Sequence, residues 1–181
     1  GQSFGGMVAM HFAARHPARL SKLILSSTAA QFRLDETVKI MRELGGDHAA
    51  EVAHKFFSNP SQGAYDTYGE VCLPLYSNPN AQEATAFRER AIERPEVALH
   101  FFADEMATMD MRSEIANITC PTLVIGGTLD PVTPTLCSQV ITDSIGENAC
   151  LQMFEGCGHG PHRDDPDGAE KVMRRFLDTS I

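Results

Sequence analysis

Three short apolar runs punctuate this sequence, and each has the length of a buried strand. They cover residues 21–25, 122–127 and 149–154. Continuous apolar runs of this length are typical of strands that are covered on both faces, as in a parallel sheet. The second run ends in two glycines, which favour a tight turn directly after that strand. We therefore expect three strands in the core.

Helical patterns lie between these runs. Residues 7–16 are apolar with small residues at helical spacing and stop before Pro17, residues 136–145 end at Gly146, and residues 169–177 are amphipathic. Proline and glycine are typical of positions just past a helix end. Because helices alternate with strands, the pattern predicts an α/β fold with a mostly parallel sheet flanked by helices.

The segment from residue 30 to residue 118 has a different pattern of apolar residues. Apolar residues such as Leu34 and Met41 recur there at helical spacing, and prolines interrupt the pattern. This predicts several short helices and no strand. We therefore divide the chain into an α/β core, residues 1–29 and 119–181, and a helical insertion, residues 30–118.

Length, charge and cysteine content narrow the class of protein. A chain of 181 residues usually makes one domain. The net charge of −9 argues against nucleic acids and anionic membrane surfaces as partners. No apolar run approaches the roughly 20 residues that span a bilayer. The five cysteines are an odd number without regular spacing, which fits reduced thiols and a cytoplasmic protein.

The first five residues, GQSFG, match the pattern G-x-S-x-G. In a nucleophile elbow, the serine sits in a strained turn between a strand and a helix, and its hydroxyl is exposed above the sheet. We expect Ser3 to be the nucleophile, with Gly1 and Gly5 lying too close to the turn to tolerate a Cβ. The backbone N–H of Phe4 would stabilise a developing oxyanion. A glycine-rich loop without chemistry is the alternative.

Two further candidates follow the second and third predicted strands. Asp130 comes after residues 122–127 and a glycine turn, and His159 follows residues 149–154 between glycines. The carboxyl ends of parallel strands are where such sheets place active sites. The order Ser, Asp, His along the chain is that of an α/β-hydrolase triad. A simple turn aspartate is the alternative for Asp130.

Other chemistry is less well supported by the spacing. His162 is a rival to His159 as the base, but it lies further into the turn. Cys150 and Cys157 with these two histidines match no zinc-ligand pattern. Asp165 and its acidic neighbours fit helix caps better than metal ligands. We therefore expect no metal and no cofactor.

With these residues in place, the chain resembles an α/β-hydrolase of the proline iminopeptidase-like group. The resemblance rests on GQSFGGMVAM at the start, EVCLPLY in the insertion, CPTLVIGGTLDPVTP around Asp130 and EGCGHGPHRDDP around His159. The motifs around the three triad candidates are shared with esterases, lactonases and C–C bond hydrolases. Only the insertion points towards iminopeptidases.

The resemblance implies that residues 30–118 form a helical lid over the active site. Family iminopeptidases hold the substrate's amino terminus with two glutamates, and Glu105 is a match for the one in the lid. At the second place this chain has Pro131, which departs from the family pattern. The resemblance also implies that the first strands and a second oxyanion donor precede Gly1, so we expect an N-terminally truncated chain that is inactive alone.

Three functions remain open on the sequence. The first is a serine hydrolase that releases N-terminal residues from short peptides through an acyl-enzyme, as a proline iminopeptidase does. The second is a carboxylesterase, lactonase or C–C bond hydrolase that acts on small molecules. The third is a binding protein that has the fold but no activity, against which the complete set of Ser3, Asp130 and His159 argues.

Overall fold

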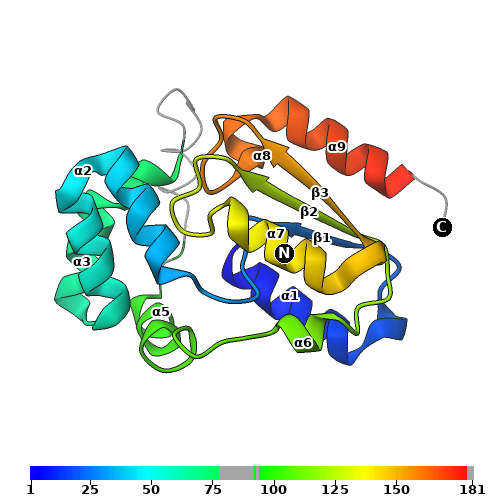
Figure 1. Ribbon diagram of the computed structural model, residues 1–181, viewed down its shortest axis with the longest axis horizontal. Coiled ribbons are helices and arrows are strands. Elements are labelled where there is room, and N and C mark those ends of the chain that lie inside the picture. The colour runs from blue at the N-terminus through cyan, green and yellow to red at the C-terminus, as the bar shows by residue number, and fades with distance from the viewer. Residues whose placement is uncertain (78–91, 93, 179–181) are drawn as a thin grey trace.

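The computed structural model describes residues 1–77, 92 and 94–178 (Figure 1). Within these residues, three parallel strands form one sheet in the order β1, β2, β3. The strands are β1 (Leu23–Ser26), β2 (Thr122–Gly127) and β3 (Ala149–Phe154). The expected bounds of β2 and β3 are confirmed, and β1 begins two residues later than its apolar run. β2 is buried at every position because it has a neighbouring strand on each side.

Helices cover both faces of the sheet, as an α/β fold requires (Figure 1). On one face lie α1 (Phe4–Arg15), α6 (Arg112–Ile115) and α7 (Thr135–Ile145), and on the other lies α9 (Pro166–Asp178). Short helical turns occur at η1 (Pro17–Arg19), η4 (Gly146–Asn148) and α8 (Pro161–Asp164). The α9 helix begins three residues earlier than predicted, because Asp165 accepts a hydrogen bond from the Gly168 N–H and caps it.

Successive side chains of β2 point to opposite faces of the sheet and so build two cores. Val124 packs with Met10 and Ile141 of the α1 and α7 helices. Leu123 and Ile125 pack on the other side, against α9. The alternation of side chains along a strand therefore sorts one apolar run into two helix-facing layers.

The segment between β1 and β2 is mainly helical in its described part, as the helical spacing of its apolar residues predicts. Besides α6, which packs on the sheet, its described elements are α2 (Leu34–Ser58), α3 (Gln62–Val71), η2 (Leu73–Tyr76), α5 (Pro95–His100) and η3 (Phe101–Glu105). The α2 helix is longer than the short helices we expected, but it bends at Gly46, whose φ of 77° interrupts the helix. Residues 78–91 and 93 of the predicted insertion lie outside the described residues.

The helical segment has a core of its own, built mainly from aromatic rings and methionine. Phe56 stacks on Tyr68 with ring centroids 4.7 Å apart, and Met41 and Met106 are buried beside them. Val132, which follows β2, joins the same cluster. The helices are thereby fastened to the sheet next to the carboxyl end of β2. Among the described residues, no helix has the length and apolarity needed to cross a membrane.

The close approach of two loops at the end of the sheet depends on Gly127. A Cβ at this position would lie 2.1 Å from the Cys157 carbonyl oxygen and 2.3 Å from that of Gly158. The two loops are also tied by a hydrogen bond of 2.9 Å from the Leu129 N–H to the Cys157 carbonyl. Only glycine fits here, because backbone atoms cannot move aside as a flexible side chain can.

We expect Gly127→Ala to lower the free energy of unfolding by about 1–3 kcal/mol, the usual cost of overpacking. The control is Gly63→Ala, where an added Cβ meets nothing within 4 Å in the described structure. Because alanine favours a helix over glycine, that variant should be unchanged or slightly more stable. Urea unfolding of both variants checks this, and equal stability of the two would contradict the steric argument.

Candidate active site

Ser3 lies at a sharp turn between the end of the sheet and the α1 helix. Its φ of 48° and ψ of −125° lie outside the regions that side chains prefer. The Ser3 N–H donates to the Ser26 carbonyl at 3.0 Å, so the turn is anchored to β1. A backbone strained in this way is typical of a nucleophile elbow.

The glycines around this turn differ in their steric roles. A Cβ on Gly1 would lie 2.4 Å from the Gly5 carbonyl oxygen, as we expected. The same expectation for Gly5 is wrong, because Gly5 is exposed and an added Cβ there meets nothing within 4 Å among the described residues. The crowded position is Gly6, where a Cβ would lie 2.6 Å from the side chain of Thr28.

Thr28 also fastens the carbonyl group of the strained residue. Its Oγ1 donates to the Ser3 carbonyl at 2.7 Å, and this oxygen also accepts from the N–H groups of Gly6 and Met7. Three donors therefore hold one peptide group and offset the cost of the unfavourable φ. The sequence pattern gave no sign of Thr28, which is 25 residues away from Ser3 along the chain.

Asp130 occupies the turn after β2 and is 1% exposed. Its Oδ1 accepts from the backbone N–H groups of Val132 and Thr133, both at 2.9 Å, and its Oδ2 accepts from the Thr133 hydroxyl at 2.8 Å. Burial by itself would raise the pKa of Asp130, but the adjacent His159 and these donors together hold it below its usual range. Asp130 is therefore both a turn residue and the partner of a histidine, so the two interpretations of this residue are compatible.

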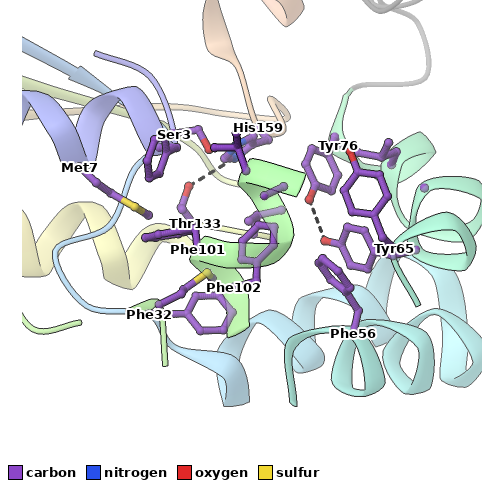
Figure 2. A pocket seen from close by; sticks show the side chains of 18 of the residues that line it. Ser3, Met7, Phe32, Phe56, Tyr65, Tyr76, Phe101, Phe102, Thr133 and His159 are labelled. Carbon is purple, nitrogen blue, oxygen red and sulfur yellow. Dashed lines mark hydrogen bonds between the residues drawn. The ribbon is translucent and has the colours of Figure 1, made fainter. Parts of the chain in front are cut away.

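His159 links the other two candidates. Its Nδ1 lies 2.9 Å from Asp130 Oδ2 and 3.0 Å from Oδ1. Its Nε2 lies 2.9 Å from the hydroxyl oxygen of Ser3, and Figure 2 shows these two side chains next to each other. With Asp130 as the acceptor at Nδ1, the proton belongs on Nδ1, and Nε2 is free to accept from Ser3. The structure therefore brings together three residues that are separated by up to 156 positions.

The backbone of His159 is held from three directions. Its N–H donates to the Tyr76 carbonyl at 2.6 Å, while its own carbonyl accepts from Gln2 Nε2 at 3.2 Å and from the Arg163 guanidinium at 2.6 Å. The ring of Tyr76 also packs edge-on against the imidazole, with centroids 5.2 Å apart. Since Tyr76 belongs to the helical segment, that segment contributes directly to the position of the imidazole.

A cavity of about 490 Å³ opens in front of Ser3 and His159. Its walls combine residues of the core with residues of α2, α3, η2, α5 and η3, and most of its surface is apolar (Figure 2). Aromatic side chains predominate, namely Phe4, Phe32, Phe56, Tyr65, Tyr68, Tyr76, Phe101 and Phe102. Among the described residues that line it, Arg94 is the one with a permanent charge, and none is a carboxylate.

Two further site predictions concern Phe4 and Glu105. Phe4 is the first residue of α1 and directly follows Ser3, so its N–H has no acceptor within the helix, and its role as an oxyanion donor stays a prediction. Glu105 ends η3, is exposed, and does not line the cavity, which Phe101, Phe102 and Met106 line from the same stretch. The predicted contact of Glu105 with a substrate amino group therefore has no support in the described structure, because the helix turns this carboxylate to solvent.

The alternatives to His159 and to a metal-free site can be compared with the same structure. His162 lies half-buried on α8 and makes no hydrogen bond to Ser3 or Asp130 within the described residues. Burial, and then the charge of Arg163, lower the pKa of His162. The described histidines, cysteines and acidic residues contain no group of three placed as metal ligands would be.

The sequence alone missed Thr133, Thr28 and Tyr76. Thr133 could have been found, since a hydroxyl three residues after an aspartate is typical of a turn closed by side-chain hydrogen bonds. Thr28 and Tyr76 act through contacts between distant parts of the chain, and no local pattern marks them. Tyr76 lies within the EVCLPLY motif, but its contact with His159 depends on the fold.

Known proteins share sequence similarity with this chain over nearly its whole length. Residues 1–166 match the family described as serine aminopeptidase S33. A proline iminopeptidase from Thermoplasma volcanium is 29% identical over 206 residues, which cover 100% of this chain and 65% of the relative. A pimeloyl-[acyl-carrier protein] methyl ester esterase from Photobacterium profundum is 24% identical over 182 residues, which cover 98% of this chain and 68% of the relative.

Among solved structures, the enol-lactonase from Burkholderia xenovorans LB400 superposes with a TM-score of 0.70 at 21% identity, covering 99% of this chain and 64% of the lactonase. This similarity shows the fold. The chain thus spans about two thirds of the length of the relatives that it matches. Their names differ in substrate, so the comparisons support the fold class and the hydrolase family more strongly than any one reaction.

We expect Thr133→Val to destabilise the fold in a pH-dependent way. The folded pKa of Asp130 is lowered, so its ionised form adds stability above its unfolded pKa of about 4, and this stability is lost as the pH falls through the folded value. Valine removes one donor to a charged acceptor, a loss of about 1.5–3 kcal/mol at pH 7 that should shrink below about pH 4.

The control for this prediction is Thr142→Val. The Thr142 hydroxyl donates to the Ser138 carbonyl within α7, and no titrating group is involved. The effect of Thr142→Val on the free energy of unfolding should be the same at pH 7 and below about pH 4. Urea unfolding of both variants at several pH values is the measurement, and a pH-independent loss in Thr133→Val would refute the account of Asp130.

Proposed function

Because this chain belongs to the serine aminopeptidase S33 family, a family of α/β-hydrolases, we propose that it carries the catalytic triad of a serine hydrolase. Ser3 is the nucleophile, His159 the general base and Asp130 the group that orients the imidazole. The observation that carries the proposal is the chain of hydrogen bonds from the Ser3 hydroxyl through His159 to Asp130, at 2.9 Å for each link. This arrangement argues against the alternative of an inactive binding protein.

The mechanism follows from these contacts. His159 Nε2 takes the proton of the Ser3 hydroxyl as its oxygen attacks the substrate carbonyl, and Asp130 stabilises the imidazolium that forms. The Phe4 N–H, at the start of α1, donates to the developing oxyanion. His159 then gives the proton to the leaving group, and water, activated by the same imidazole, releases the acyl group from Ser3.

We propose an uncharged ester or lactone of a small molecule as the substrate. The cavity beside Ser3 is apolar and aromatic, and none of its described lining residues is a carboxylate. A protonated amino terminus buried there would lose its hydration without gaining a counter-ion from any of the described lining residues, which is costly. Glu105 does not offset that cost, since it is exposed and outside the cavity.

Release of N-terminal proline from short peptides is the second candidate. The family description and the 29% identity with a proline iminopeptidase favour it. The aromatic walls formed by Phe32, Phe101 and Phe102 would also accommodate a pyrrolidine ring. C–C bond hydrolysis uses the same three catalytic residues and remains an alternative within the first candidate.

We also propose the division into an α/β core, residues 1–29 and 119–181, and a helical cap, residues 30–118. The described helices of the cap supply the wall of the cavity that faces Ser3 (Figure 2). In this proposal the cap selects the substrate and the core carries out the chemistry. A small molecule or a short peptide fits the cavity of about 490 Å³, and a folded protein chain does not.

The catalytic assignment predicts different effects at the two neighbouring histidines. In the protein that carries this sequence, a fluorophosphonate probe should label Ser3, and Ser3→Ala should abolish labelling. His159→Ala should slow labelling and ester turnover by roughly a factor of 10³ or more, because triad members act together. His162→Ala, the matched control, should change them less than tenfold. Labelling that survives Ser3→Ala, or equal losses at both histidines, would refute the assignment.

The substrate assignment is tested with a panel of esters, lactones and amides. We expect kcat/KM for short-chain p-nitrophenyl esters to exceed that for prolyl and alanyl amides, and blocking the amino group of an amide should make little difference. Glu105→Gln should leave every rate unchanged, because this carboxylate is turned to solvent. Strong turnover of free prolyl amides with blocked ones inert would instead establish the iminopeptidase, and a loss in Glu105→Gln would assign the amine contact to Glu105.

A further inference from the structure

Two tyrosine hydroxyls form a polar spot in the wall of the cavity. Tyr68 belongs to α3 and Tyr76 to η2, both residues line the cavity, and their hydroxyl oxygens lie 2.7 Å apart. The surrounding wall is made of apolar and aromatic groups such as Phe56 and Leu73. In Figure 2, Phe56 lies on the side of the cavity away from Ser3, and Tyr76 lies next to His159.

The hydroxyl pair has one more donor than it uses. Each hydroxyl carries one proton, and a single proton is enough for the bond between them. Tyr68 and Tyr76 have no other side-chain hydrogen bond within the described part of the chain. One O–H is therefore left to donate, and an unpaired O–H in an apolar wall costs free energy unless an acceptor meets it.

Both rings are fixed before any ligand arrives. Tyr68 is 4% exposed and packs against Phe56 in a tilted contact and against Phe57 edge-to-face, with centroids 4.7 Å and 5.2 Å apart. Tyr76 packs against the imidazole of His159, and its carbonyl accepts the His159 N–H. A donor that is already held in place loses little entropy on binding, so its hydrogen bond contributes to selectivity.

The charge state of the pair narrows the kind of acceptor. Burial raises the pKa of both tyrosines, and the negative charge of Asp130 raises each of them further, so both hydroxyls stay neutral. The same negative potential opposes an anionic ligand at this spot, and because the cationic Arg94 lines the same cavity, a carboxylate ligand tests which of the two charges prevails. No described carboxylate lines the cavity to balance an ammonium group there.

Building on the hydrolase function proposed above, we propose that the Tyr68–Tyr76 hydroxyl pair is a specificity subsite that binds an uncharged hydrogen-bond acceptor, such as a ketone or ether oxygen, in the apolar part of the substrate. The substrate class is thus an ester with two polar groups: the scissile carbonyl at Ser3, and a neutral acceptor that meets the tyrosine pair. A purely aliphatic chain leaves the spare O–H unpaired, and a charged group at this position binds less well.

The experiment measures binding separately from turnover. Binding is measured in a Ser3→Ala background, where esters are not cleaved, with p-nitrophenyl heptanoate as the reference ligand. Its counterparts carry a ketone, moved one carbon at a time along the acyl chain, or a terminal carboxylate. A second set carries the ketone in the alcohol part. One ketone position should bind about two- to tenfold more tightly than the aliphatic reference, and the carboxylate should bind more weakly.

Removing both hydroxyls, in Tyr68→Phe/Tyr76→Phe, should abolish the preference for the ketone and leave the affinity of the aliphatic reference within about twofold. Tyr65→Phe is the matched control, because Tyr65 lines the same cavity without belonging to the pair, and it should keep the preference. A purely structural role would lower the affinity of every ligand together with the melting temperature.

No preference for any ketone position, a preference that survives the double substitution, or tighter binding of the carboxylate would overturn the proposal. The hydrolase function and the tyrosine subsite are tested separately. Fluorophosphonate labelling, in the parent protein and in tyrosine variants that keep Ser3, tests the hydrolase function, and absent labelling of Ser3 in the parent protein counts against it. The binding preference tests the subsite by itself.

Discussion

A carboxylate as deeply buried as that of Asp130 is tolerated in a fold only when hydrogen-bond donors replace the water that it has lost. Two backbone N–H groups, a threonine hydroxyl and an imidazole supply them here. The loop after β2 must therefore curl around its own aspartate, and the loop after β3 must bring His159 against it. The absence of a side chain at Gly127 lets the two loops approach each other closely enough. The hydroxyl of Ser3, which lies against His159, completes a chain of contacts that starts at the buried carboxylate of Asp130.

The sheet and the three triad candidates could be predicted from the sequence because their signals are local. The runs that form β2 and β3 are continuous and apolar, and each is followed by glycines and a polar residue at the carboxyl end of a strand. The same local logic failed at Gly5, where the pattern implied crowding and the structure has open space. The choice of Glu105 came from the resemblance to iminopeptidases, and the structure leaves this residue exposed and outside the described lining of the cavity, since a family motif does not specify which face of a short helix meets solvent.

The parts of the site that the sequence did not indicate are contacts between segments that are distant along the chain. Thr28 reaches the carbonyl of Ser3, and Tyr76 reaches the backbone of His159. Neither contact has a motif, because each depends on how the helical segment and the sheet are placed relative to each other. The aromatic lining of the cavity also depends on contacts between distant segments. Its residues are scattered along the chain from Phe4 to Phe102, and only the fold brings them together.

The hydrogen bond between the helical segment and His159 uses a main-chain oxygen of Tyr76. Every amino acid supplies that oxygen, so the link depends on the path of the backbone and not on the identity of the residue. Evolution could therefore change the side chains of this segment, and with them the substrate, while His159, the proposed general base, keeps its hydrogen bond to this oxygen. The architecture in this way separates the part of the protein that is free to diversify from the part that the chemistry constrains.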